Sequence, residues 1–130
     1  MKRELSQGLH ALLDGKLDTF EKLELVLAVR TAGQSVTVSD LAMELQVGRD
    51  VLRRVIADVI ASGVLQAVDG DAVCLRHGSW EPQIAEAAGI YEADPTTLLK
   101  VLSRISMERI RSRAARTFAD AFRIRGKAGD

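Results

Sequence analysis

The sequence has few of the residues that form cross-links, metal sites and aromatic cores. It contains one cysteine, two histidines and two prolines in 130 residues, and aromatic residues make up 4%. A single Cys74 cannot form an internal disulfide, and its place in a β-prone run indicates a half-buried apolar residue. His10 and His77 lie far apart with no Cys or carboxylate at ligand spacing, so we expect neither a metal site nor a cofactor.

Long apolar runs and catalytic motifs are also missing. No run of about eighteen apolar residues and no charged segment followed by a long apolar one occurs, so we expect no membrane span, no signal peptide and a cytoplasmic location. There is no phosphate-binding glycine loop, no nucleophile elbow and no histidine placed to act as a base, so we expect no enzyme. The 47% of apolar residues, mostly Leu, Val, Ile and Ala, can form one mainly helical domain with a modest core.

Residues 35–76 carry the most definite pattern in the chain. Ser39 and Asp40 favour the start of a helix, which we expect over residues 40–46. Val47 and Gly48 suit a tight turn with a positive φ, and apolar residues then recur at spacings of three and four, which predicts a second helix over residues 49–62. These apolar positions are Leu52, Val55, Ile56, Val59 and Ile60.

Two β-prone runs follow the second helix. Gly63 suits its left-handed end, and residues 64–68 and 72–76 flank Asp69, Gly70 and Asp71, a strong hairpin signal. Helix, turn, helix and hairpin is the order of a winged helix-turn-helix. The segments LAMEL and VGRDVLRRVIADVIASGVL resemble bacterial transcriptional regulators of the MarR, PadR and Rrf2 families. That resemblance implies a DNA-binding domain whose second helix enters the major groove while the hairpin, or wing, touches phosphates.

The segments before this motif are expected to be helical. Residues 1–16 show a leucine pattern interrupted by Gly8, which we interpret as a small docking helix. The winged domain is expected over residues 17–78. Its first helix would span residues 17–30, with Asp18 and Glu21 as a capping box, and an edge strand over residues 35–38 would pair with the wing.

The segments after the motif complete the expected fold. Ser79 and the pair Asp94 and Pro95 mark two helix starts in residues 79–125, a helical region assigned to dimerisation, and residues 126–130 are expected to form a disordered tail. The fold class is therefore mainly α, in the α+β sense. It is a winged helix-turn-helix with a short β-hairpin wing and additional N- and C-terminal helices.

The last helix has two apolar groups on opposite sides. At 100° per residue the side changes near Ser106, so either the helix bends there or a straight helix packs its second half on something else. The first group is Leu98, Val101, Leu102 and Ile105. The second, which we assign to a homodimer interface, is Met107, Ile110, Ala114, Phe118, Ala121 and Phe122.

The net charge of zero hides an uneven distribution. Residues 1–95 carry nine Lys and Arg against fifteen Asp and Glu, whereas residues 96–130 carry nine against three. Four arginines form a basic face opposite the second apolar group: Arg109, Arg113, Arg116 and Arg123. Three interpretations of this face remain open, namely a solvated surface beside a dimer seam, a contact to nucleic acid or a protein partner, and a contact to an anionic membrane.

Four arginines are the candidates for DNA contact: Arg49, Arg53, Arg54 and Arg76. Arginine suits this role because its planar guanidinium can bond guanine or hold a phosphate. A second interpretation pairs Arg53 and Arg54 with Asp50 and Asp58 on a solvated helix. The sequence therefore predicts a transcriptional regulator that binds double-stranded DNA as a homodimer. The alternative is a non-catalytic winged-helix adaptor that binds an acidic protein partner through its basic C-terminal helix.

Overall fold

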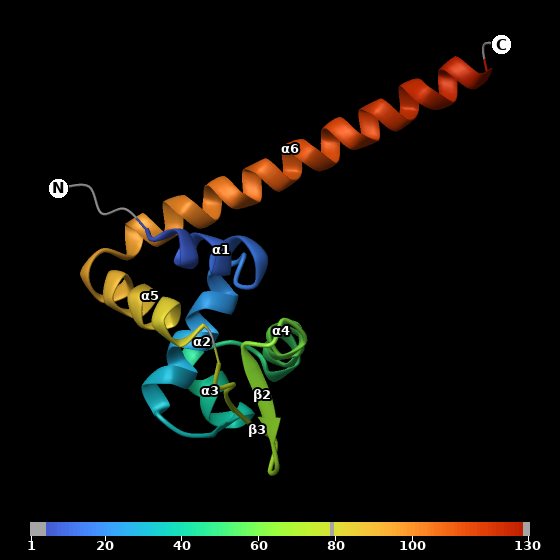
Figure 1. Ribbon diagram of the computed structural model, residues 1–130. Coiled ribbons are helices and arrows are strands. Elements are labelled where there is room, and N and C mark those ends of the chain that lie inside the picture. Colours follow the sequence, from blue (N-terminus) through green and yellow to red (C-terminus); the bar gives the residue numbers. More distant parts are fainter. Residues whose placement is uncertain (1–4, 79, 129–130) are drawn as a thin grey trace.

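The part of the chain that the structure describes forms six helices and three short strands (Figure 1). The computed structural model describes residues 5–78 and 80–128, with side chains as far as Ala121, so the expected cap at Ser79 lies outside the described residues. The elements are α1 (Gln7–Gly15), α2 (Phe20–Ala32), β1 (Val36–Thr37), α3 (Val38–Leu45), α4 (Arg49–Ala61), β2 (Leu65–Val68), β3 (Ala72–Leu75), α5 (Glu81–Ala93) and α6 (Pro95–Ala128).

One apolar core joins all six helices. Leu9, Leu12 and Leu13 of α1 are completely buried, and α1 packs against α5 and the beginning of α6. The same buried cluster continues through α2, α3 and α4 to Leu65 and Val73 of the wing. The leucine pattern at the start of the chain therefore belongs to the core that supports the winged helix-turn-helix.

Threonine side chains cap two helices where the sequence indicated other residues. The Thr19 hydroxyl accepts a hydrogen bond from the Lys22 amide, so α2 begins after Thr19, and the expected Asp18 cap is wrong. The Thr37 hydroxyl likewise accepts from the Asp40 amide, so α3 starts before Ser39. Each threonine has the extended backbone angles that a capping residue requires. Thr19 lies one position after the expected cap Asp18, and Thr37 lies two positions before the expected cap Ser39.

The turn between α3 and α4 also differs from the expectation. Gln46, with φ of 57°, takes the left-handed conformation that closes α3. Gly48 has φ of −66° and precedes α4 without a positive dihedral angle. The sequence correctly located this turn, but the residue with the positive φ is Gln46, a conformation that non-glycine residues adopt as single residues.

The wing has the topology that the sequence predicts. β3 pairs antiparallel with β2 on one side and with β1 on the other, giving a three-stranded sheet in the order β1-β3-β2. Gly70 and Asp71 have positive φ in the hairpin turn, and Gly63, which follows the C-cap residue Ser62 of α4, has φ of 84°. The fold is a winged helix-turn-helix, mainly α with a small antiparallel sheet.

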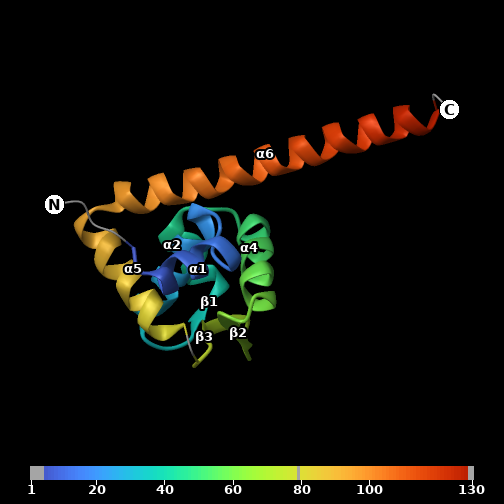
Figure 2. The same ribbon diagram turned by 45° about the horizontal axis from the view of Figure 1, so that its top comes forward.

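The last helix is continuous and projects from the body (Figures 1 and 2). Leu98, Leu102 and Ile105 are buried against α1 and α5, whereas Met107 and Ile110 are 49% and 58% exposed. Of the two sequence alternatives, the structure has the straight helix rather than a bend near Ser106. α6 runs to Ala128, into the segment expected to be a disordered tail, and residues 129–130 lie outside the described residues.

Candidate nucleic-acid interface

α4 occupies the place of the recognition helix in this fold. Leu52, Ile56 and Val59 are buried on the side that packs against α2, α3 and β2. Asp50 and Arg54 are exposed on the opposite side, and Arg49 is exposed in the first turn of the helix. Arg54 forms no ion pair within the part of the chain whose side chains are described. Two arginines of α4 are therefore available to a partner that approaches from the solvent side.

Arg53 is tied to the wing instead. Its Nη1 and Nη2 atoms donate to Oδ1 and Oδ2 of Asp71 at 2.8 and 2.7 Å. The hydrogen bonds and the charge of Asp71 raise the pKa of Arg53, and the hydrogen bonds from Arg53 lower the pKa of Asp71, with a smaller contribution from Arg49. The pairing of Arg53 with Asp50 or Asp58 that the sequence left open is wrong, because the main partner of Arg53 is Asp71 in the wing turn.

The wing itself carries little positive charge. Asp69 and Asp71 lie in its turn, whereas Arg76 lies at the other end, where its backbone amide donates to the Val64 carbonyl oxygen at 2.9 Å. Arg76 is exposed, but it is at the base of the wing rather than at the tip. Residues 49–76 contain four arginines and four aspartates. DNA binding is favoured when an excess of positive charge on the protein releases counterions from the phosphates. The winged surface alone lacks this excess.

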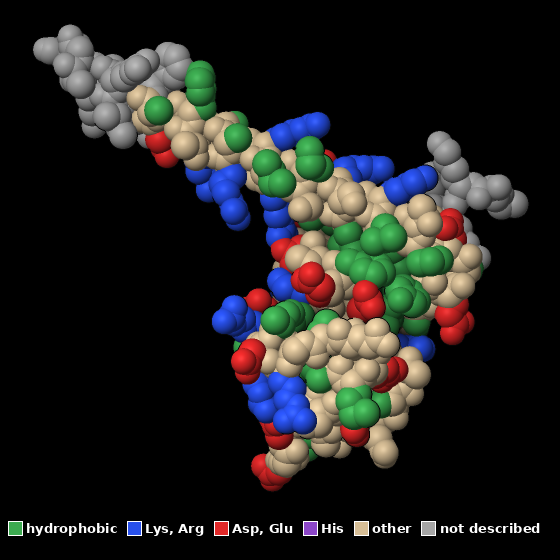
Figure 3. All heavy atoms as spheres, turned by 180° about the vertical axis from the view of Figure 1, so that it is seen from behind, with side chains coloured by type: hydrophobic (Ala, Val, Ile, Leu, Met, Phe, Trp, Pro, Cys, Tyr) green, Lys and Arg blue, Asp and Glu red, His purple; other side chains and the backbone are tan. Residues whose placement is uncertain are grey.

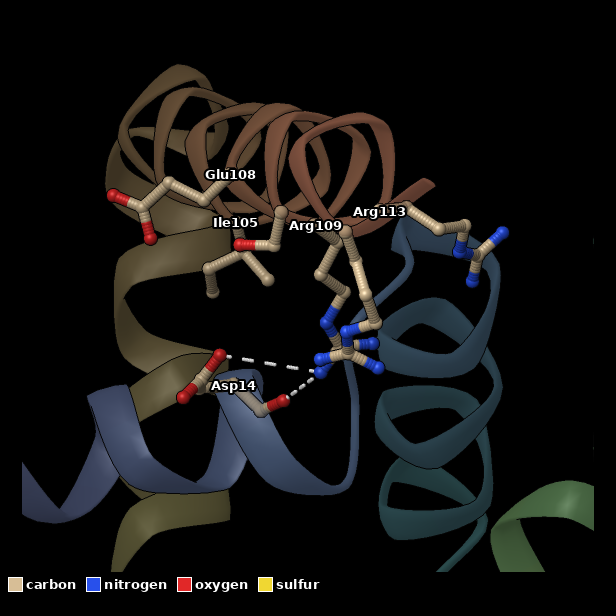
Figure 4. Close-up of a pocket in the computed structure, with 7 residues that line it drawn as sticks. Asp14, Ile105, Glu108, Arg109 and Arg113 are labelled. Atoms are coloured by element: carbon tan, nitrogen blue, oxygen red, sulfur yellow. Dashed lines mark hydrogen bonds and ion pairs between the residues drawn. The ribbon is translucent and has the colours of Figure 1, made fainter. Parts of the chain in front are cut away.

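The basic face of α6 is divided between two roles. Arg109 reaches the body, where it pairs with Asp18. It also donates to the backbone carbonyl oxygen of Asp14 (Figure 4). Lys22 contacts the other oxygen of Asp18 at 2.8 Å. Arg109 thus anchors α6 to Asp18, which lies just before α2 and 91 positions earlier in the chain. Helical periodicity gave the side of α6 on which Arg109 lies but could not identify this contact.

An open hollow of about 350 Å³ lies beside this anchor, under the start of the projecting part of α6. Arg113 points away from the Asp14 contact in Figure 4. Neither Arg113 nor Arg116 forms an ion pair with any side chain that the structure describes. The hollow is lined by Asp14, Ile105, Glu108, Arg109, Ser112, Arg113 and Arg116. The side chain of Arg123 lies outside the described residues.

The second apolar group lies on the outer side of α6. Figure 3 shows hydrophobic side chains along the projecting part of the helix, with Lys and Arg side chains on both sides of them. Met107, Ile110, Ala114, Phe118 and Ala121 are exposed, with Phe118 at 65%, and the side chain of Phe122 lies outside the described residues. Five of the six residues assigned to a dimer interface are therefore exposed on one side of α6.

A small apolar cleft beside α4 was not anticipated from the sequence. Leu45, Val47, Val51 and Val55 line it, and Glu21 and Glu24 of α2 form its rim. Among the described side chains there is no group of three or more His, Cys, Asp or Glu residues that could hold a metal ion. None of the described helices combines the length and apolar character needed to cross a bilayer.

Comparisons with known proteins give only a distant likeness. The sequence matches no protein-family model and no curated protein. Among solved structures it is similar to the adhesin competence repressor (AdcR) of Streptococcus pyogenes, with 15% sequence identity over 80% of this chain and 81% of that one and a TM-score of 0.47. A likeness of this kind assigns neither a family nor a function to the chain.

Proposed function

We propose that the protein is a DNA-binding transcriptional regulator that acts as a homodimer. The observation that carries this proposal is that two exposed arginines of α4, Arg49 in its first turn and Arg54 on its outward side, form no ion pairs within the described side chains. In winged helix-turn-helix proteins this helix enters the major groove, and arginine is the residue that most often bonds guanine there. Arg53 is less available than these two arginines, because its guanidinium is paired with Asp71 in the wing turn.

Exposed apolar residues on α6 support the homodimer. Met107 and Ile110 are about half exposed in a helix that projects from the body. A self-complementary contact between two copies is the commonest way to cover such a surface. Two copies also present two recognition helices and twice the positive charge of α6, which suits a DNA site with two half-sites.

A binding measurement tests the function directly. Wild-type protein is titrated onto duplex DNA of random sequence at two salt concentrations, beside the variants Arg49→Gln/Arg54→Gln and Lys100→Gln/Arg104→Gln. The second pair has the same change in charge but lies on exposed positions of α6 away from α4. We expect salt-sensitive binding that the α4 variant weakens at least tenfold and the control changes little. No binding by the wild type at either salt concentration would exclude a DNA-binding function.

An adaptor that binds an acidic protein is the second candidate, and the charge of the wing favours it. Two carboxylates lie in the wing turn, and the arginines of residues 49–76 are matched by aspartates in number. An adaptor of this kind would bind its partner through the basic face of α6 and would not be retained on duplex DNA at physiological salt. The titration above therefore separates the two functions.

A further inference from the structure

The basic side of α6 and the exposed side of α4 border the same notch of the molecule. We infer that Arg113 and Arg116 of α6 form a second contact to the phosphate backbone of the duplex that α4 reads. This inference rests on the proposed DNA-binding function and adds a site to it. The ligand group is the phosphate diester of double-stranded DNA, contacted without reading of bases.

The direction of Arg113 and Arg116 follows from the continuity of α6. At 100° per residue, these two arginines lie on the same side of the helix as Leu98, Leu102 and Ile105, which are buried against the body. Since α6 is a single helix from Pro95 to Ala128, the side that packs on the body continues as an arginine side once the helix has passed the edge of the body. The exposed apolar group faces the other way.

The arginine side overhangs the part of the body that carries the recognition helix. In both Figures 1 and 2, α4 lies on the side of the body toward which α6 projects. The exposed face of α4 is the one turned away from α2, α3 and β2. Figure 3 shows the resulting notch between the projecting helix and the body, with Lys and Arg side chains on both of its walls. A duplex that contacts α4 from the solvent side therefore passes the basic side of α6.

Arg109 fixes the direction of this overhang. Its guanidinium bonds both Asp18 and the backbone of Asp14, so α6 is held at the last point where it touches the body. Arg113 and Arg116 follow about one and two helical turns later. They are therefore presented on a rigid helix whose base is anchored, rather than on a mobile tail. Arg109 is a positioning residue, since its own charge is matched by Asp18.

Charge favours DNA as the occupant of the notch. The winged surface has as many aspartates as arginines, so it does not supply the positive excess that phosphate binding requires. Arg113 and Arg116 form no ion pair with the described side chains, and the carboxylates that line the hollow belong to Asp14, beside Arg109, and to Glu108. Two guanidiniums on the wall of the notch that α6 forms supply the missing charge. An acidic polypeptide would use the same two arginines but would gain nothing from the notch that α6 shares with α4.

The salt dependence of DNA binding tests this contact. Dissociation constants of the wild type, Arg113→Gln/Arg116→Gln and the control Lys100→Gln/Arg104→Gln are measured on several duplex sequences over a range of salt. Each lost phosphate contact lowers the slope of log K against log salt by about 0.9, so the first variant should lose about 1.8 per protomer that contacts DNA. The loss of affinity should be the same for every sequence. Control substitutions on the far side of α6 should leave the slope near the wild-type value.

Three outcomes overturn the inference, and they are distinguishable. If the wild type binds DNA and Arg113→Gln/Arg116→Gln keeps its slope, α6 does not contact the backbone although the proposed function stands. If the wild type binds no duplex, the function and the inference both fail. If the variant loses binding to polyglutamate but keeps its DNA slope, the arginines serve an acidic polypeptide. Circular dichroism of the variant shows whether the exposed substitutions leave the helical content unchanged.

Discussion

Arg53 of α4 and Asp71 of the wing turn form a bidentate ion pair, with nitrogen-to-oxygen distances of 2.8 and 2.7 Å. The side chains of Arg53 and Asp71 are 49% and 55% exposed. Solvent screens such a pair, so its contribution to stability is small. Its main consequence is geometric, because it joins the recognition helix to the wing and occupies an arginine that could otherwise meet DNA.

Replacing Asp71 by Asn should therefore strengthen DNA binding. Asp71→Asn removes a carboxylate from the wing turn and releases the Arg53 guanidinium toward phosphates. We expect severalfold tighter binding at low salt, with a melting temperature close to that of the wild type. Filter binding and thermal denaturation measure the two quantities. Weaker binding would mean that the pair holds the wing in its DNA-binding position and that this role outweighs the released charge.

The same pair predicts an unusual titration of Asp71. Hydrogen bonds from Arg53 lower the pKa of Asp71 below the ordinary 3.8. Because the folded-state pKa is the lower one, the pair contributes its stability above the unfolded pKa and loses it as the pH falls through the lowered value. The pair should thus persist between pH 5 and 8, as NMR of the side-chain carboxyl carbons can follow. In Arg53→Gln the Asp71 midpoint should rise toward 3.8, and an unchanged midpoint would contradict the pairing.

Packing of α4 on the core predicts a loss of stability on truncation. Leu52 and Ile56 are buried, so Leu52→Ala or Ile56→Ala should lower the free energy of unfolding by about 2 to 4 kcal/mol. Val51 is the neighbouring control, since it is 56% exposed and Val51→Ala should cost far less. Urea denaturation provides the comparison. Equal effects at Val51 and Leu52 would mean that the buried side of α4 has been assigned wrongly.

The sequence allowed the winged helix-turn-helix to be predicted because its signals are local. The spacing of apolar residues predicted α4, and Gly70 between two β-prone runs predicted the wing. Helix starts were predicted less well: Asp18 was expected to cap α2, but the adjacent Thr19 has the extended backbone angles and caps it. Local signals predicted the order of the elements correctly, but they did not predict the exact residues at which the elements begin and end.

Contacts between distant residues explain what the sequence could not predict. Arg53 has Asp50 and Asp58 close by in the chain, yet its partner is Asp71 on the other side of a folded hairpin. Arg109 was assigned to the basic face of α6, but its pair with Asp18 depends on how α6 crosses the body. Both pairs arise from tertiary packing, which helical periodicity does not contain. The available arginines could therefore be identified only once the folded chain was known.

The outer side of α6 predicts the state of association. Met107, Ile110 and Phe118 are 49 to 65% exposed along one side of a projecting helix, a large apolar surface for a soluble monomer. A second copy that pairs through the same surface would cover it, and Ala114 between these residues permits close approach of the two helices. Ile110→Asp together with Phe118→Asp should therefore convert a dimer into a monomer, because the pairing would bury uncompensated carboxylates.

Sedimentation velocity at micromolar concentrations measures this change. Met43→Asp is the matched control, since Met43 is an exposed apolar residue on α3, away from α6, and the variant should remain dimeric. A wild type that sediments as a monomer at every concentration would contradict the homodimer. DNA binding would then have to come from single protomers, in which Arg113 and Arg116, without ion pairs among the described side chains, would supply the contact of α6 to the phosphate backbone.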